Sequence, residues 1–242
     1  MPEVLYIDEE IIVAVKPAGV ESQAARRFEP DMVSSLKKYL VMHRLCTPGR
    51  EPYIGVIHRL DKPVSGVMVY ARTKNAAAAL SSQLQNGKMK KIYQAVVCGK
   101  PVENVENYVD YLKKSVDGNI SHVVESGENG GKRAELTCRV LKTGVFEGDG
   151  QLSLVEIHLK TGRHHQIRVQ MAAHGHPVYG DAKYNPAFSD GAAFQGAERE
   201  RAQLALCAVS LSFIHPATKK QMTFSIQPKS GAFIKFCQTD SE

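Results

Sequence analysis

Apolar and polar residues follow one another along this chain in short periodic segments, which predict a mixture of strands and helices. Two-residue alternation or compact apolar runs predict strands at residues 4–16 (two strands around an acidic turn), 66–71, 91–99, 151–160, 204–213 and 221–228. Apolar spacings of three and four predict helices at residues 30–45, 73–87 and 164–175. Thr73 is the expected N-terminal cap of the second helix, and Gly87 is its expected end.

The order of these elements indicates the fold class. Strands and helices are mixed without regular β-α-β alternation, which favours an α+β fold with a large, mostly antiparallel sheet. Residues 101–150 are polar and rich in turn residues, and residues 125–132 (ESGENGGK) are expected to form an exposed loop. The polar segment 185–201 is expected to be mobile. No internal repeat or low-complexity linker divides the chain, so we expect one domain over residues 1–242.

Composition narrows the class of protein. The chain has 242 residues, of which 43% are hydrophobic, and it can therefore bury a substantial core. Its apolar runs are too short to span a membrane, and from the first ten residues we expect no secretory signal. Five cysteines without a CxxC pair predict reduced thiols in a cytoplasmic protein. The net charge of +6 suits a polyanionic partner, although charge alone leaves that question open.

The first stretch that can carry chemistry is GVIHRLDKPVSG, at residues 55–66. Its apolar residues are expected inside, whereas Arg59 and Asp61 are costly to bury unless they are paired. Asp61 follows an apolar run and precedes Lys62 and Pro63, so we expect it where a strand-like segment turns. Spacing alone allows two interpretations of Asp61: a carboxylate that binds turn amides, or a reactive group.

A second stretch, residues 161–181 (TGRHHQIRVQMAAHGHPVYGD), gathers four histidines and two arginines. It contains no H-E-x-x-H motif and no cysteine at ligand spacing, which argues against zinc. The start of a helix with arginines beside it suits an anion instead. Ile167 and Met171 share a helical face that should point to the core. Arg168 lies about 100° round from Ile167, at an edge where a carboxylate can meet it.

A third stretch, residues 86–100, places Lys88, Lys90 and Lys91 directly before a predicted strand that carries Tyr93. A positive rim beside an aromatic face suits unstacked bases. A solvated run of charges next to a core tyrosine explains the same pattern. No phosphate-binding glycine loop and no G-x-S-x-G motif is present.

Taken together, these stretches resemble the RluA-type family of RNA pseudouridine synthases. HRLDKPVSG resembles the family's catalytic-aspartate motif, KKIYQAVVCGK its tyrosine motif, and TGRHHQIRVQMAAHGHPVYGDAKY its arginine-bearing motif. LYIDEEIIVAVKPAGV and LALCAVSLSFIHP resemble the two ends of the family's catalytic domain. The resemblance implies the pseudouridine synthase fold, a bent and mostly antiparallel sheet with flanking helices and loops around a central cleft.

The resemblance also implies the activity, which is conversion of uridine in RNA to pseudouridine. Asp61 is then the catalytic carboxylate, which attacks C1′ or the base C6, or removes the 2′ proton. Arg168 pairs with Asp61, and Tyr93 stacks on the uracil. The expected substrate-binding residues are His58, Arg59, Leu60, Ile167, Arg163, Lys88, Lys90 and Lys91. Neither a metal nor another cofactor is expected.

The expected partner is a stem-loop of ribosomal or transfer RNA, and the expected state is a monomer. The target uridine must be flipped out of a helix or already lie in a loop. The chain departs from the family pattern at Val64, Gln170 and Cys207. These departures bear on which RNA the protein selects. We expect no separate N-terminal RNA-binding domain of the S4 type. Two alternatives remain: an RNA-binding protein without catalysis, and a metal-dependent RNA hydrolase that uses Asp61 and the histidines at 164–176.

Overall fold

The computed structural model describes residues 1–24, 29–116, 119–189, 203–228 and 231–237. Residues 190–201 of the segment expected to be mobile lie outside the described residues. The chain divides into two compact units. The first unit comprises Met1–Lys91 and Ala208–Gln227, and the second comprises Ile92–Cys207 and Pro228–Glu242.

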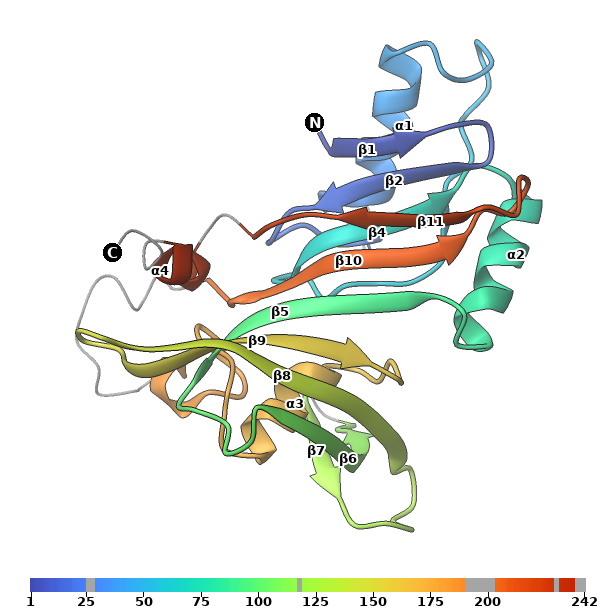
Figure 1. Cartoon of the computed structure of the whole chain (residues 1–242). Helices are drawn as coiled ribbons and strands as arrows, with labels where there is room; N and C mark the ends of the chain where they lie inside the picture. The colour runs from blue at the N-terminus through green and yellow to red at the C-terminus, as the bar shows by residue number, and fades with distance from the viewer. Residues whose placement is uncertain (25–28, 117–118, 190–202, 229–230, 238–242) are drawn as a thin grey trace. The chain divides into compact units, whose positions relative to one another are not determined.

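The first unit is built on a sheet with two helices (Figure 1). Its strands are β1 (Glu3–Ile7), β2 (Ile11–Lys16), β3 (Gly55–Val56), β4 (Ser65–Ala71), β10 (Leu206–Ile214) and β11 (Gln221–Ser225). The strand order is β1-β2-β4-β10, with β3 paired to β4 and β11 paired to β10. The helices are α1 (Met32–Met42) and α2 (Lys74–Gln85). Side chains from β2, β4, α2 and β10 form one buried apolar core, which includes Val13, Val69, Leu80 and Phe213.

Local sequence signals account for the ends of these helices. The Asp31 carboxylate accepts a hydrogen bond from Ser34 N at 2.7 Å and caps α1. Thr73 caps α2, as predicted, by accepting from Ala76 N at 3.0 Å. Gly87 follows the end of α2 with a φ of +67°, a conformation that glycine adopts without strain.

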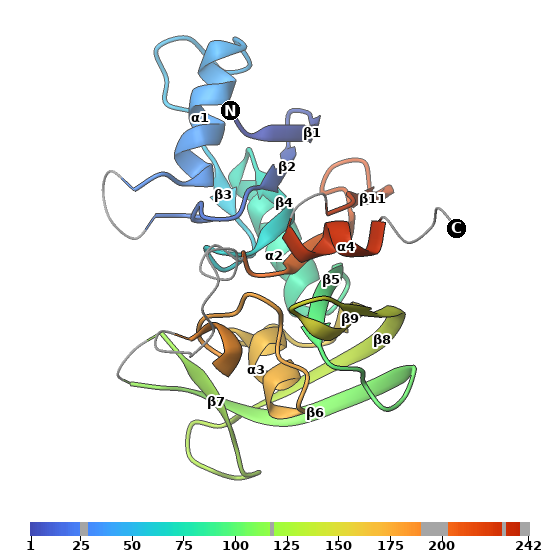
Figure 2. The same ribbon diagram turned by 90° about the vertical axis from the view of Figure 1, so that its left-hand side faces the viewer.

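The second unit carries the other sheet strands and a buried helix (Figures 1 and 2). Its strands are β5 (Lys90–Cys98), β6 (Val105–Lys114), β7 (Ser121–Val124), β8 (Lys132–Phe146) and β9 (Gly150–Leu159), in the order β5-β9-β8-β6-β7. Every neighbouring pair in this series is antiparallel. The helices are α3 (Gln166–Ala173), α4 (Ile234–Cys237) and the 3₁₀ turns η1 (Pro186–Phe188) and η2 (Gly231–Phe233). Helix α3 packs against β6 and β7.

Residues 101–150 contain strands that the sequence analysis did not predict. The polar, turn-rich composition concealed β6, β7 and β8, which occupy most of this segment. In β8, Ala134, Leu136 and Cys138 are buried, and the polar residues between them face the other way. The predicted exposed loop at residues 125–132 is confirmed up to Gly131, because β8 begins at Lys132.

The described elements therefore form an α+β fold in which antiparallel pairing dominates, as the sequence predicted. Within the described part of the chain, no helix is both long enough and apolar enough to cross a membrane.

Candidate active site

Asp61 lies in the first unit, at the turn between β3 and β4. Its backbone carbonyl accepts a hydrogen bond from Val64 N at 3.0 Å, which closes a four-residue turn through Lys62 and Pro63. Leu60, immediately before Asp61, is buried, whereas Asp61 is half-buried. The turn predicted at Asp61 is therefore present.

The residue before Asp61 is fixed by a serine far away in sequence. Ser22 Oγ donates to the carbonyl of Leu60 at 2.9 Å and accepts from Leu60 N at 3.0 Å. Ser22 is itself buried. These reciprocal bonds hold both backbone polar groups of Leu60, so the chain enters the Asp61 turn in one defined position.

The residue after Asp61 is fixed by a buried lysine. Lys16 is fully buried at the end of β2, and its Nζ donates to the carbonyls of Pro17, Val20 and Lys62 at 3.0, 2.6 and 3.1 Å. Burial lowers the pKa of Lys16 to about 8, while the negative charges of Glu21 and then Asp61 act in the opposite direction. Lys16 therefore anchors the turn and places positive charge near the candidate carboxylate.

His58 and Arg59 differ in their environments. His58 is buried, and its Nε2 accepts from Val69 N at 3.4 Å, which ties the segment to β4. Burial, and then the positive charge of Lys91, lower the pKa of His58 to about 3, so the imidazole is neutral at pH 7. Arg59 is exposed. His58 is thus held against β4, and Arg59 is accessible to a ligand, while a substrate contact by either residue stays a prediction.

Tyr93 and the neighbouring lysines follow the strand pattern of β5. Tyr93, opposite Ile157 of β9, is only 7% exposed. Lys88 and Lys90 are exposed. Lys91 is half-buried, and burial lowers its pKa. Of the three lysines, Lys88 and Lys90 are therefore better placed to meet a solvated anion.

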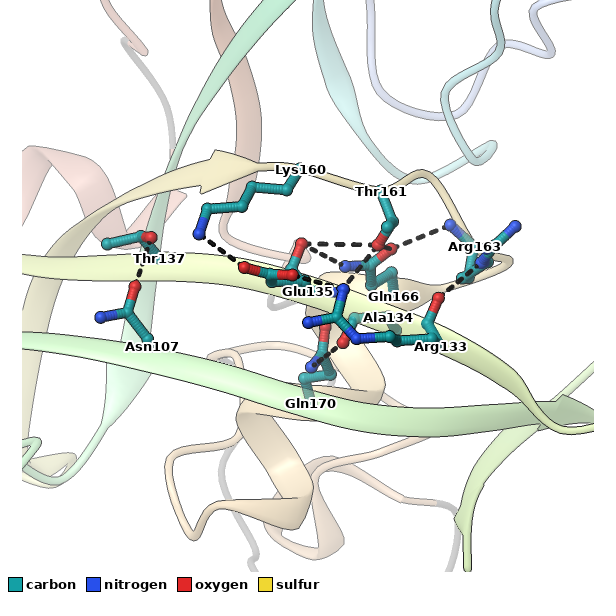
Figure 3. Close-up of polar contacts among 10 residues, drawn as sticks. All are labelled: Asn107, Arg133, Ala134, Glu135, Thr137, Lys160, Thr161, Arg163, Gln166 and Gln170. Carbon is teal, nitrogen blue, oxygen red and sulfur yellow. Dashed lines mark hydrogen bonds and ion pairs between the residues drawn. The ribbon is translucent and has the colours of Figure 1, made fainter. Parts of the chain in front are cut away.

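The turn that leads into α3 is bonded to β8 (Figure 3). Glu135 N donates to Thr161 Oγ1 at 2.8 Å, and the same hydroxyl donates to Gln166 Oε1 at 2.8 Å. Gln166 Oε1 also accepts from Arg163 N at 2.9 Å, and Gln166 Nε2 donates to the Glu135 carbonyl at 3.1 Å. This network fixes the first turn of α3 and the backbone of Arg163 on the sheet.

Within α3, Arg168 forms a buried bidentate pair with Asp181. Arg168 Nε donates to Asp181 Oδ2 at 2.7 Å, and Nη2 donates to Oδ1 at 2.6 Å. The exposed fractions of the two side chains are 5% and 0%. Ile167 and Met171 are buried, as predicted from their shared face. The family resemblance implied a pair between Arg168 and Asp61. Those two residues belong to different units, and their pairing stays a prediction.

The histidines of the same segment serve as hydrogen-bonding groups. His164 Nδ1 lies 2.8 Å from Ser121 Oγ, and its Nε2 lies 2.6 Å from Asn119 Oδ1. His165 Nδ1 lies 2.7 Å from Tyr184 Oη. Within the residues that the structure describes, no three His, Cys, Asp or Glu side chains gather in a geometry suited to a metal ion.

Comparison with known proteins decides the family. The model of the RNA pseudouridylate synthase family matches residues 10–173, which include Asp61, Tyr93 and Arg168. The chain belongs to the RNA pseudouridylate synthase family. It is an RluA-type RNA pseudouridine synthase, an isomerase that converts uridine in RNA to pseudouridine.

Curated relatives of this pseudouridine synthase align over most of its length. Ribosomal large subunit pseudouridine synthase D of Zymomonas mobilis is 35% identical over 93% of this chain and 68% of its own length. Dual-specificity RNA pseudouridine synthase RluA of Vibrio vulnificus is 35% identical over 88% of this chain and 78% of its own length.

Solved structures show the same fold at lower identity. Human RNA pseudouridylate synthase domain containing 4 superposes with a TM-score of 0.73 at 21% identity, over 94% of this chain and 88% of the human chain. Human RNA pseudouridylate synthase domain containing 1 superposes with a TM-score of 0.71 at 22% identity, over 94% of this chain and 84% of the human chain. The pseudouridine synthase fold that the sequence implied is confirmed.

Sequence reasoning missed four residues that support the pseudouridine synthase motifs: Lys16, Ser22, Asp181 and Tyr184. Lys16 and Asp181 lie inside stretches that resembled family motifs, and a charged residue among apolar neighbours was the available signal. Ser22 gave no such signal, because its bond to Leu60 joins positions 38 residues apart.

Proposed function

We propose that Asp61 is the catalytic residue with which this enzyme isomerises uridine in ribosomal or transfer RNA. The observation that carries the proposal is the anchored turn: Ser22 holds the backbone before Asp61, and Lys16 holds the backbone after it. A half-buried carboxylate on an anchored turn, with a buried ammonium nearby, suits a group that must stay ionised and keep its position.

In the proposed reaction the bond between uracil N1 and C1′ breaks, the uracil rotates, and a bond forms between C5 and C1′. The C5 proton is lost and N1 gains a proton, so atoms and electrons balance without an external oxidant or reductant. The Asp61 carboxylate starts this sequence by attacking C1′ or C6, or by removing the 2′ proton. Each route needs the ionised form of Asp61.

Arg168 and Tyr93 complete the proposed machinery. A permanently charged guanidinium paired with Asp61 offsets the cost of removing the carboxylate from water. Tyr93 offers an aromatic ring for stacking on uracil, and Arg59 fills the space left by a flipped base or holds a phosphate. Leu60 and Ile167 supply apolar surface next to the reacting groups.

The RNA contacts follow from charge and exposure. Lys88 and Lys90 are exposed cations that suit backbone phosphates, and the proposal assigns them that contact. The names of the two curated relatives, a ribosomal large subunit enzyme and a dual-specificity RNA enzyme, favour a structured RNA with a stem-loop as substrate. We further propose that residues 1–242 act as one catalytic domain, as a monomer, in the cytoplasm and without a cofactor.

Release of tritium from RNA labelled at uridine C5 tests this proposal. The wild type should release tritium in the presence of a chelator, and Asp61→Asn should release none while its RNA affinity stays within several-fold. The substitution keeps the side-chain shape and removes the charge, and affinity comes mainly from phosphate contacts. Turnover by Asp61→Asn close to the wild type would remove Asp61 from the mechanism. Cleavage of the RNA by the wild type would indicate a hydrolase instead.

A further inference from the structure

Three exposed cations surround the start of α3 in the second unit: Lys114, Arg163 and Lys183, called here the α3 basic surface. His164 connects them. Its Nε2 contacts the side chain of Asn119, whose carbonyl accepts from Lys183 Nζ at 2.8 Å. Its Nδ1 contacts Ser121, which pairs with Lys114 across β6 and β7. Arg163 immediately precedes His164 in the chain.

Backbone carbonyls, not carboxylates, hold two cations of the α3 basic surface in place, Arg163 and Lys183. Arg163 Nε donates to the Arg133 carbonyl at 2.9 Å (Figure 3), and Lys183 Nζ donates to the Asn119 carbonyl. Within the described residues, none of the three cations forms an ion pair with a carboxylate. The charges of Arg163 and Lys183 are therefore fixed in position by neutral groups, and among the described residues no carboxylate balances either of them.

Other exposed cations of the second unit do form ion pairs with carboxylates. Both Arg133 and Lys160 contact the Glu135 carboxylate at 2.5 Å (Figure 3), and Arg139 contacts Glu156 at 2.8 Å. These cations each balance the charge of a carboxylate, whereas the cations of the α3 basic surface do not. Only the second kind produces a local excess of positive potential.

The pKa of a buried histidine depends in part on two of these cations, Lys183 and Lys114. Burial, and then the charges of Arg168, His164, Lys183 and Lys114, lower the pKa of His165 to about 3. His165 Nδ1 is bonded to the hydroxyl of Tyr184, so its position beneath this surface is fixed.

We infer that the α3 basic surface binds backbone phosphates of the RNA substrate, through Arg163 and Lys183 in particular. The inference rests on the proposed function, because it identifies where the same RNA is held. A guanidinium fork and an ammonium suit phosphate oxygens. Since these cations are exposed, each contact contributes mainly through release of counterions and carries no base preference.

The test is the salt dependence of RNA binding by the double variant Arg163→Gln/Lys183→Gln. Loss of two phosphate contacts should reduce the slope of log K against log salt concentration by about 1.4 to 1.8. Lys160→Gln is the matched control, because it removes one exposed cation that Glu135 already balances, and its slope should equal that of the wild type. Thermal melting confirms that all variants are folded.

An unchanged slope in the double variant would overturn the inference, and so would an equal loss for Lys160→Gln. Tritium release by the wild type is measured on the same RNA. If the wild type turns over and the double variant has an unchanged slope, the α3 basic surface is rejected as a phosphate-binding site and the proposed function stands. Absence of turnover on every RNA tested rejects the proposed function, and the binding slopes then still report whether the surface holds phosphates.

A second and independent observation concerns the buried pair between Arg168 and Asp181. In addition to the two guanidinium contacts, Asp181 Oδ1 accepts from Lys183 N at 3.0 Å and Tyr184 N at 3.2 Å. The Arg168 guanidinium lies 5.1 Å from the centre of the Tyr184 ring, and Ser121 N donates to the Tyr184 hydroxyl at 2.8 Å. The plane and direction of the guanidinium are therefore fixed from two sides.

We propose that Asp181 is a positioning residue for Arg168. This also rests on the proposed function, which places Arg168 beside the catalytic carboxylate. Asp181 engages the edge of the guanidinium formed by Nε and Nη2, so the orientation of the remaining Nη1 is set by the pair. A misdirected arginine would bind RNA as before and would support the reaction poorly.

A double-mutant cycle on turnover tests this role. Asp181→Asn should lower kcat about 100-fold with RNA affinity within threefold, because a small misplacement of a catalytic group has an effect of that size. In the Arg168→Met background, Asp181→Asn should have no further effect on kcat per folded molecule. Tyr184→Phe keeps the ion pair and should lower kcat less than Asp181→Asn does.

Two results would overturn the positioning role: normal kcat in Asp181→Asn, or an equal loss of kcat in both backgrounds. The second result would mean that Asp181 acts on the fold and not through Arg168. Normal turnover by Arg168→Met would instead reject the role of Arg168 in the proposed function, which keeps the two failures distinct.

Discussion

At the scale of single residues, Lys16 is a charged group that the fold of the first unit buries completely. Removing an ammonium from water is unfavourable, and its three backbone acceptors compensate only in part, as the lowered pKa shows. This unfavourable free energy arises at the residue whose ammonium binds the Lys62 carbonyl and so fixes the turn after Asp61. Lys16 thus links folding stability to the geometry of the proposed catalytic group.

Lys16 should therefore produce a measurable pH dependence of stability. Its pKa is about 8 in the folded state and near the ordinary 10.5 when unfolded, so the unfolded chain binds more protons between these values. The free energy of unfolding should rise with pH across this window, by about 3 kcal/mol from this residue. Urea denaturation of the wild type and Lys16→Met from pH 7 to 10.5 measures the difference. Parallel curves would contradict the prediction.

The sequence predicted Asp61, Tyr93 and Arg168 as candidates because short motifs carry them, and a motif is local. It did not predict that Asp181 binds Arg168, since an arginine at a helix edge is compatible with any nearby carboxylate. The choice of partner depends on how the loop at residues 181–185 folds back over α3. That packing is a tertiary property, which neither spacing nor composition encodes.

At the scale of elements, β4 follows the Asp61 turn, and near its start Gly66 lies very close to β10. Gly66 has a φ of +140°, and a Cβ atom there would lie 2.5 Å from the backbone of Ala208 in β10. The close approach of these two strands therefore requires glycine at position 66. Both strands contribute buried side chains to the core of the first unit.

Gly66→Ala should destabilise the protein by at least about 2 kcal/mol, because it adds both overpacking and backbone strain. Gly87→Ala is the matched control: its φ is also positive, at +67°, but open space surrounds the position where its Cβ would lie. Gly87→Ala should lower the free energy of unfolding by less than Gly66→Ala does, because it adds backbone strain without overpacking. Thermal or urea denaturation measures both variants. An equal loss of stability would show that the approach to Ala208 is not limiting.

The elements that sequence reasoning found and missed differ in physical character. Strands β2 and β4 are almost wholly buried and read as apolar runs, so they were found. Strand β8 has one polar face that carries Arg133, Glu135 and Thr137, and its alternation was hidden by the turn residues on both sides. An amphipathic strand in a polar region becomes evident only when its partners, β6 and β9, are in place.

At the scale of the whole molecule, the first unit is assembled from both ends of the chain. Residues 208–227 return to it after residues 92–207 of the second unit and contribute most of β10 and all of β11. Leu211 and Phe213 of β10 are buried in the same core as β2 and β4. Ile214 exchanges two hydrogen bonds with the side chain of Gln83, at 2.7 Å each. The core of the first unit is therefore complete only after about nine-tenths of the chain has been made.

A fragment of residues 1–203 should accordingly fail to fold its first unit. It lacks Leu211 and Phe213, each worth roughly 1.5 to 3 kcal/mol on burial, and it leaves β4 without its neighbour β10. Insertion of a short Gly/Ser segment after Gly127, in the exposed loop between β7 and β8, is the matched perturbation, and it should leave the melting temperature within a few degrees. Circular dichroism and thermal melting separate the two. A cooperative transition in the fragment with the full amplitude of the wild-type chain would show that the first unit's core is complete without β10.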